Sequence, residues 1–505
     1  MNLEKSLLKN WLTLLGLVLS LGALFIFILL FIADLFFGHT SPYFNLLTYV
    51  CIPSVLGAGI ALIILGLLLN FFLQNYQKGS GKFCPCSYLK ATKPKLTLDF
   101  SRGSFWGSLI CLLVILGVIG SVAAIAGYKV YHWTEDDEFC GELCHTPMKP
   151  ENVAHQFSPH AKIKCVECHV GPGIEAYTYA KINGIRQLAQ TLTKTWNTPI
   201  HVPVSAMYAR HLDGKTKIEH TCLECHYQED YIGSKEKVFT HFLKNEEDLK
   251  TQTRMILNVG GGNPDDGFIG GIHWHASKGS KIEFATDDNK RNGEIMWVRM
   301  TTTSITNIYT VSNFKMDETK HEIFTMSCLD CHNRPAHRYV SPVTAVDLAM
   351  EIGTLPTDLG DSVKYVVVDF LTAPYETEEE ALKAIEEGMQ EYFDGSEYLE
   401  SATKTVQTIY KRNIFPEMKA SWEAYPDYIG HKETLGCARC HNSELTSETD
   451  GEAIRNGCQD CHQITHQFKE GEWDETDLKG LTFYHPDGND QEDITMCSKC
   501  HNGTY

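Results

Sequence analysis

Charge is absent from a long stretch near the N-terminus, where no charged residue occurs between Lys9 and Asp34. The uncharged run exceeds the ~20 residues that a helix needs to cross a bilayer, which predicts a membrane anchor. No small-residue cleavage site is evident, and this absence argues against a removable signal peptide. Two more apolar stretches, at about Leu46–Gln74 and Phe105–Tyr128, bring the predicted number of transmembrane spans to three.

Lys and Arg are absent from the loop between the first two spans, residues 34–45, but six of them occur between the second and third spans. The positive-inside rule places the basic loop in the cytoplasm. The N-terminus is therefore predicted to be cytoplasmic, and the chain after Tyr131 periplasmic, in a bacterial inner membrane. The spans also lack paired histidines for a b-type haem.

Acidic residues dominate the remainder of the chain. Residues 1–133 contain 9 basic and 3 acidic residues, whereas residues 134–505 contain 35 and 60. An acidic surface would steer a small basic protein toward it, although solubility alone explains the charge equally well. The expected partners are therefore membrane lipid and small basic periplasmic proteins, and no nucleic acid.

Cysteine and histidine are far more numerous than a hydrophobic core requires, with 18 Cys and 22 His in 505 residues. In a C-x-x-C-H motif two thiols add to the two vinyl groups of one porphyrin, and the adjacent histidine becomes the proximal ligand of the iron. Structural zinc does not place a histidine after every second cysteine. Six stretches have this c-type haem pattern: Cys165, Cys168 and His169; Cys222, Cys225 and His226; Cys328, Cys331 and His332; Cys437, Cys440 and His441; Cys458, Cys461 and His462; and Cys497, Cys500 and His501.

A seventh stretch, "FCGELCH", has one extra residue between Cys140 and Cys144 before His145. In the company of six exact copies it is interpreted as a seventh haem site. The alternatives are a Cys140–Cys144 disulfide, or one thioether with a free thiol. Cys84 and Cys86 lie outside these motifs and could bind metal or sense redox state, but ordinary reduced cysteines are the simpler interpretation.

Each iron also needs a distal ligand unless it binds substrate. The last three motifs are accompanied by three spare histidines, His431, His466 and His485, which favours closed bis-histidine sites. Met148 could provide a thioether ligand that raises the potential of the first haem, or it could be an ordinary methionine. Ten upstream histidines compete for about three places: His155, His160, His201, His211, His220, His241, His273, His275, His321 and His337.

The apolar stretches and the haem motifs together predict a membrane protein. It would have three N-terminal transmembrane helices and a periplasmic, mainly α or irregular multihaem cytochrome c domain with a small β insert. Alternating patterns suggest the insert, and helical spacing suggests a linker between two haem clusters. The expected parts are a membrane anchor at 1–133, a tetrahaem domain at 134–342 with its insert at about 227–326, a helical linker at 343–427 and a trihaem domain at 428–505.

The stretches "FCGELCHTPM", "SPHAKIKCVECHVGPG", "TCLECH" and "CLDCHNRPAH" resemble the NapC/NirT/NrfH family of membrane-anchored periplasmic quinol dehydrogenases, over roughly Ser104–Ser341. The resemblance implies that Met148 approaches the first haem and that His160 and His337 are ligands. It also implies a quinol pocket with a lysine, at Lys181, and a carboxylate. No Asp or Glu occurs in residues 176–212, and three spans and seven haems exceed the family's usual one and four.

These observations together predict a quinol dehydrogenase that oxidises menaquinol and relays electrons through seven covalently bound haem c groups to periplasmic cytochromes. Two alternatives remain open. A terminal nitrite or hydroxylamine reductase would need one open haem, and a pure relay would receive its electrons from another quinol-oxidising subunit.

Overall fold

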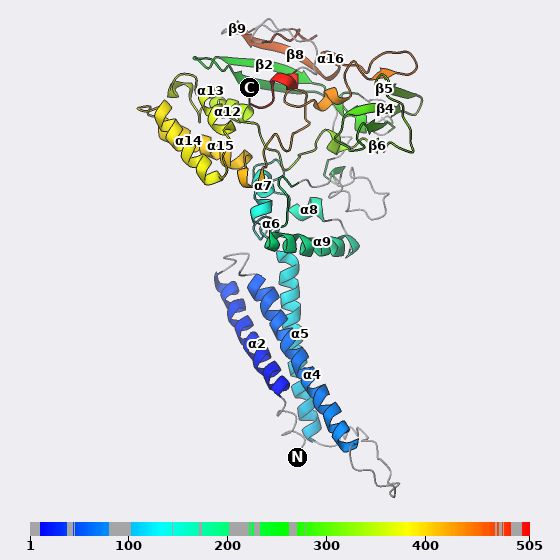
Figure 1. Ribbon diagram of the computed structural model, residues 1–505, viewed down its shortest axis with the longest axis vertical. Coiled ribbons are helices and arrows are strands. Elements are labelled where there is room, and N and C mark those ends of the chain that lie inside the picture. Colours follow the sequence, from blue (N-terminus) through cyan, green and yellow to red (C-terminus); the bar gives the residue numbers. More distant parts are fainter. Residues whose placement is uncertain are drawn as a thin grey trace. The chain divides into compact units, whose positions relative to one another are not determined.

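The computed structural model divides the chain into two compact units, unit 1 (Met1–His145) and unit 2 (Thr146–Tyr505) (Figure 1). Cys84, Cys86 and Cys144 lie outside the described residues. The structure describes residues 11–37, 44, 46–79, 103–143, 145–170, 174–200, 222–223, 225–226, 233–261, 270–277, 279–469, 472–473, 477, 479–485 and 497–504.

Unit 1 consists of long apolar helices. Among the described residues, two segments are long and apolar enough to cross a membrane, Trp11–Asp34 and Leu46–Leu67. Helix α5 covers the residues of the third expected span, but the side chains of its first half are outside the description, so the third span stays a prediction. The helices of this unit are α2 (Trp11–Phe37), the π-helical turn η1 (Leu46–Cys51), α4 (Ile52–Gly79), α5 (Gly103–Trp133) and α6 (Asp137–Gly141).

Small residues line the contact between α2 and α4, which run side by side (Figure 1). A Cβ added to Gly16 would lie 2.6 Å from the carbonyl oxygen of Gly59, and one added to Gly66 would lie 2.9 Å from the backbone nitrogen of Thr13. Between apolar helices this close backbone approach maximises dispersion contacts, because lipid supplies no hydrophobic driving force for association.

A buried carboxylate connects three helical elements of unit 1. Asp34 at the end of α2 accepts hydrogen bonds from the Tyr49 hydroxyl of η1 and from Lys129 Nζ of α5, the latter at 3.1 Å. A charged group in apolar surroundings is costly unless it is paired and hydrogen-bonded. These contacts therefore fix α2, η1 and α5 together at one end of the unit.

Replacing Gly59 with leucine is expected to weaken the α2–α4 contact, because a Cβ there would lie 2.5 Å from Ser20 Oγ. Overpacking of this kind costs roughly 1–3 kcal/mol. Gly57→Leu is the matched control, since among the described residues nothing lies within 4 Å of a Cβ at that position. SDS titration of the detergent-solubilised protein, followed by circular dichroism, measures the difference. Equal transition midpoints for the two variants would contradict this packing.

Unit 2 contains two antiparallel sheets that join the expected insert to the C-terminal part of the chain. In the first, β2 pairs with β1 on one side and with β8 on the other, and β9 pairs with β8. Its strands are β1 (Lys235–Phe242), β2 (Lys250–Leu257), β8 (His462–Lys469) and β9 (Glu472–Trp473).

The second sheet has the order β6-β3-β4-β5-β7. Its strands are β3 (Lys281–Thr286), β4 (Ile295–Thr301), β5 (Thr306–Thr310), β6 (Phe324–Thr325) and β7 (Thr446–Ser447). Since β7 and β8 come from the expected trihaem domain, the insert and that domain share both sheets. The prediction of a mainly helical or irregular domain is corrected here: unit 2 is mixed α/β, because C-terminal segments complete the edges that an insert alone would leave unpaired.

Four helices follow the insert and build a hydrophobic core: α12 (Pro342–Glu351), α13 (Val363–Thr372), α14 (Glu378–Tyr392) and α15 (Leu399–Asn413). Ala381, Ile385 and Met389 recur at i, i+4 and i+8 on α14, and all three are fully buried. The remaining positions of α14 are mostly exposed, and half of them are acidic. Figure 1 shows the four helices gathered together, and their buried apolar side chains form one cluster, so the segment expected as a linker has a packed core.

The other helices of unit 2 are short, apart from α7 and α9. They are α7 (His145–Gln156), α8 (Cys165–His169), α9 (Ile174–Thr193), η4 (Ile272–Ala276), η5 (Cys328–Asp330), η6 (Thr357–Leu359), η7 (Pro416–Met418), η8 (Gly436–Arg439), α16 (Cys458–Cys461) and α17 (Cys497–Cys500). Five of them, α8, η5, η8, α16 and α17, lie on C-x-x-C-H motifs.

Candidate haem centres

The exact motifs form single helical turns, as far as the structure describes them. The backbone N–H of the motif histidine donates to the carbonyl of the first cysteine, at 2.7 Å for His332 and Cys328 and at 2.8 Å for His501 and Cys497. Residues three apart on such a turn point to the same side, so both thiols of a motif can reach one porphyrin. This turn explains why the two cysteines of each exact motif are three residues apart.

The second cysteines of the first two exact motifs, Cys168 and Cys225, differ in exposure. Cys168 is half-buried in α8, whereas Cys225 is exposed. The backbone N–H of Cys225 donates to the Cys222 carbonyl at 3.2 Å, and that of His226 donates to the same carbonyl at 2.8 Å. The turn thus suits attachment through both cysteines of a motif, but the thioether bonds expected at Cys168 and at Cys225 stay predictions.

The six motif histidines each lie beside a second histidine, at sequence separations from 16 residues for His485 and His501 to 168 for His169 and His337. In a haem with two axial imidazoles each iron–nitrogen bond is about 2 Å long, and the centre of each ring lies beyond its ligating nitrogen. The two ring centres are therefore about 6 Å apart. The observed separations between ring centroids run from 5.7 to 6.2 Å. The pairs are His169–His337, His226–His160, His332–His273, His441–His275, His462–His431 and His501–His485.

Backbone carbonyls orient several of the partner histidines. His160 Nδ1 bonds the carbonyl of Pro335 at 3.1 Å, and His337 Nδ1 bonds that of Glu151 at 3.1 Å. A proton held on Nδ1 in this way leaves the lone pair on Nε2, the atom that binds a metal. For His485 and His501 the two Nε2 atoms lie 3.4 Å apart.

Burial favours the neutral imidazole that a metal requires. Burial lowers the pKa of His332, His337 and His462 below the ordinary histidine value. The pKa of His501 falls to about 4, first through burial and then through the charges of Lys432 and nearby histidines. These rings are therefore neutral at pH 7 and can act as ligands without losing a proton first.

The residues of these sites fit a covalently attached haem with two axial imidazoles. A cysteine pair on one turn, a histidine directly after it and a second, half-buried imidazole about 6 Å away suit a low-spin haem c. When bound, the haem supplies a one-electron Fe(III)/Fe(II) couple. The chain supplies attachment, the two ligands and the surroundings that set the potential.

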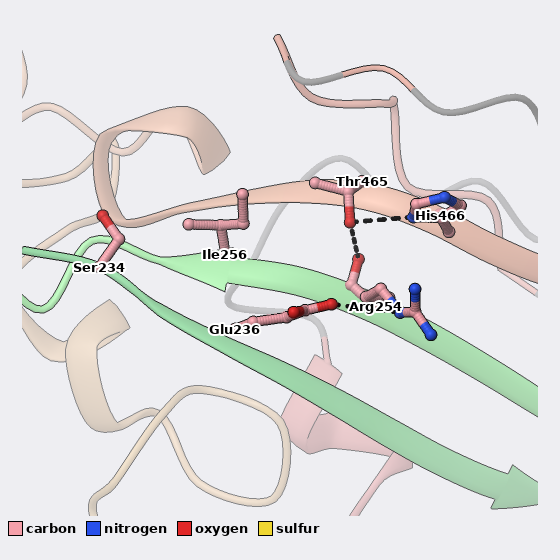
Figure 2. A pocket seen from close by; sticks show the side chains of 6 residues that line it. All are labelled: Ser234, Glu236, Arg254, Ile256, Thr465 and His466. Carbon is pink, nitrogen blue, oxygen red and sulfur yellow. Dashed lines mark hydrogen bonds and ion pairs between the residues drawn. The ribbon is translucent and has the colours of Figure 1, made fainter.

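Four of the five histidines predicted as distal ligands lie in these pairs: His160, His337, His431 and His485. The fifth, His466, lies on β8 in a shallow groove of about 380 Å³ beside Arg254 and Thr465 (Figure 2). The ring beside His441 is that of His275 rather than that of His466. In the sequence, His273 and His275 were two of ten upstream candidates. Their "HWH" spacing is not a recognised ligand motif, so no sequence signal singled them out.

Two other histidines lie near the pairs, but their hydrogen bonds differ. His155 uses Nε2 to bond the carbonyl of Ile163 at 2.9 Å. His241 bonds the Asp347 carboxylate through Nδ1 and Lys432 Nζ through Nε2 at 2.7 Å. Because the Nε2 atoms that would face a metal are engaged, these two residues are better explained as packing and charge partners.

The His241 contact belongs to a buried charged cluster. Lys364 is 2% exposed and donates to the Asp347 carboxylate and to the Phe242 carbonyl, each at 2.5 Å. The His241 ring lies 6.2 Å from that of His501. A buried charge must be compensated within the fold, so Asp347 balances the cations next to this motif.

The first motif is described in part. Cys140 lies on α6, and Met148 is half-buried on α7. Because Cys144 is outside the described residues, the haem at this site remains a prediction.

Lys181 lies on α9, half-buried, with its Nζ 4.8 Å from the centre of the Tyr177 ring. The same helix exposes Ile182, Ile185 and Leu192, which are 62%, 70% and 77% exposed. Positions 182, 185 and 192 fall on one face of an α-helix, so α9 presents an apolar stripe next to its lysine.

Sequence comparison decides the family. A cytochrome c-type protein of Geobacter sulfurreducens, ImcH, is 33% identical over 518 residues, which cover 98% of this chain and 95% of that protein. The chain belongs to the NapC/NirT cytochrome c family. Residues 104–253 match the N-terminal region of that family, which confirms the resemblance seen in the motifs. No solved structure matches the chain.

As a NapC/NirT cytochrome, the chain is a c-type cytochrome with several haem motifs and N-terminal apolar helices consistent with membrane anchoring. The family match ends at residue 253, so the partner residues His273 and His275, together with the last four motifs, lie beyond it.

The intact mass of the purified protein is expected to exceed that of the polypeptide by seven haem groups. Cys140→Ser/Cys144→Ser should remove one haem and leave six, whereas Cys51→Ser, at a cysteine outside the motifs, should remove none. A wild-type mass with six haems, lighter by the two hydrogens of a disulfide, would contradict a haem at the first motif.

Proposed function

We propose that the chain is a menaquinol dehydrogenase of the bacterial inner membrane that passes electrons through seven covalently bound haem c groups to small basic periplasmic cytochromes. The observation that carries the proposal is the set of six facing histidine pairs. An iron with two imidazole ligands has no place for a substrate, so such sites transfer electrons. The chain therefore needs an electron donor and an electron acceptor outside itself.

The anchor supports a donor dissolved in the membrane. Three spans with the basic loop in the cytoplasm would place the N-terminus inside and the haem motifs in the periplasm. Periplasmic attachment of haem agrees with this topology. Menaquinol would give up two protons to the periplasm and two electrons, and the electrons would leave one at a time for the first haem.

Helix α9 supports contact with the lipid surface. Its exposed Ile182, Ile185 and Leu192 would be costly in water, but they suit the boundary between headgroups and acyl chains. Lys181 lies next to this stripe, where its ammonium group could donate a hydrogen bond to a quinone oxygen. A lysine at the edge of an apolar face keeps its charge in water while its stem lies along the apolar surface.

The far end of the chain suits electron exit. Cys500 is exposed and precedes His501, so a haem attached there would reach the surface. The excess of acidic residues in 134–505 would attract a basic acceptor, and the rate of this encounter would fall with ionic strength.

Stopped-flow mixing of the oxidised, detergent-purified protein with a menaquinol analogue tests the donor site. Rapid haem reduction is expected for the wild type and for Lys194→Gln, which removes an exposed lysine just beyond the end of α9. Lys181→Gln is expected to slow reduction by roughly tenfold or more, the loss of about 1.4 kcal/mol from one charge-assisted hydrogen bond.

Three outcomes would contradict the donor site or the proposed function. Equal rates for both lysine variants would place the quinol elsewhere. Fast reduction by dithionite without any reduction by quinol would make the chain a relay fed by another subunit. That alternative is favoured by the absence of Asp and Glu from residues 176–212. Oxidation of the reduced protein by nitrite or hydroxylamine would instead indicate a terminal reductase.

A further inference from the structure

Two histidines separated by one residue face two different haem motifs. In η4 the His273 ring lies 6.1 Å from that of His332, with the two planes 4° apart, and the His275 ring lies 5.7 Å from that of His441. We propose that His273 and His275 are the distal ligands of the haems attached at Cys328/Cys331 and Cys437/Cys440. One segment of three residues would then hold two irons. The inference rests on the haem attachment proposed above and is independent of quinol oxidation.

Hydrogen bonds fix the tautomer that ligation requires. Nδ1 of His273 bonds the carbonyl of Val259 at 3.1 Å, and Nδ1 of His275 bonds that of Ile272 at 2.7 Å. Both carbonyls accept only, so the proton lies on Nδ1 and the lone pair on Nε2. His321 in the same insert has the opposite arrangement, since its Nδ1 accepts from the Asp317 N–H at 3.1 Å.

The segment is held firmly enough to position two rings. The N–H of His273 donates to the Val259 carbonyl at 3.0 Å. The intervening Trp274 packs against the apolar core that contains Ile282 and Leu445, and its carbonyl accepts from the hydroxyls of Ser277 and Ser280 at 2.8 and 2.7 Å. The Trp274 ring also contacts the His275 ring edge-on, with the ring centroids 5.5 Å apart, so the tryptophan helps to hold His275 in place.

Gly271 sets the entry to the turn. Its φ of 71° lies in the left-handed region, and a Cβ there would fall 2.6 Å from the Asn258 carbonyl oxygen. The N–H of Ile272 donates to that same oxygen at 2.8 Å. Only glycine allows this close approach, so the chain enters η4 in a single orientation.

The two motifs that face η4 are themselves joined. Arg291 forms a bidentate ion pair with Asp330, which lies between Cys328 and Cys331, at 2.8 and 2.6 Å. Arg439, between Cys437 and Cys440, donates to the carbonyl of Arg291 at 3.0 Å. The two cysteine turns are thus connected through one residue of the β3–β4 hairpin, and η4 supplies an imidazole to each.

This arrangement would give electrons a direct route from the haems of the upstream motifs to those of the three C-terminal motifs. The Cys328/Cys331 motif is the last of the upstream motifs, and Cys437/Cys440 is the first of the C-terminal three. A shared ligand segment fixes the relative positions of the two irons more tightly than separate loops would. The insert would therefore act as the bridge between the groups.

The test is electron paramagnetic resonance of the chemically oxidised protein, with no quinol present. His273→Ala and His275→Ala are each expected to convert one haem to a high-spin ferric signal, and the double variant two. His321→Ala is the matched control and should add no high-spin signal. Intact mass checks that each variant keeps all its haems, which separates a lost ligand from a failed attachment.

Restoring a ligand distinguishes ligation from a structural role. Added imidazole should return each alanine variant to low spin, and His275→Met should give a low-spin haem with methionine ligation and a raised potential. If an alanine variant accumulates too little protein, the methionine variant at that position decides. Unchanged bis-imidazole spectra in the alanine or methionine variants would overturn the proposal.

Discussion

Pairs of imidazoles about 6 Å apart are the constraint on which the architecture of unit 2 depends. Most pairs join segments that are far apart in sequence, such as His160 with His226 and His169 with His337. A ligand displaced by one ångström would lose its bond to the metal, so the chain between paired histidines must be rigid. The two sheets and the four-helix core provide this rigidity, and the C-terminal strands β7 and β8 extend it to the last motifs.

The same constraint explains where polar groups are buried. A ligating imidazole must be neutral and must hold its Nδ1 proton, so backbone carbonyls such as those of Glu151 and Val259 are directed at histidine rings. Within the residues that the structure describes, a buried charge such as that of Lys364 is compensated by an opposite charge, here the Asp347 carboxylate near His501. In unit 1 the contacts of Asp34 with Tyr49 and Lys129 follow the same rule.

Local patterns predicted what local chemistry determines. The apolar runs predicted the long N-terminal helices, and the helical spacing of two stretches within residues 343–427 predicted α14 and α15. The distal ligands were harder to predict from the sequence, because which of the histidines outside the motifs faces each iron depends on tertiary contacts. The count of three spare histidines near the C-terminus favoured His466, whereas the structure places His275 of the insert beside His441. The pairing of β8 with β2 was not predicted either, again because it depends on tertiary contacts. The strand β8 begins at a motif histidine and pairs with β2 across more than 200 residues, and its own sequence pattern does not identify that partner.

The central claim is that the chain moves electrons through closed haems and transforms no substrate at iron. Electron paramagnetic resonance of the oxidised wild-type protein, integrated against its haem content, tests this claim most directly. The account predicts low-spin signals for all the exact motifs, unchanged by nitrite or hydroxylamine. A high-spin signal of one full haem that shifts when either compound is added would contradict it.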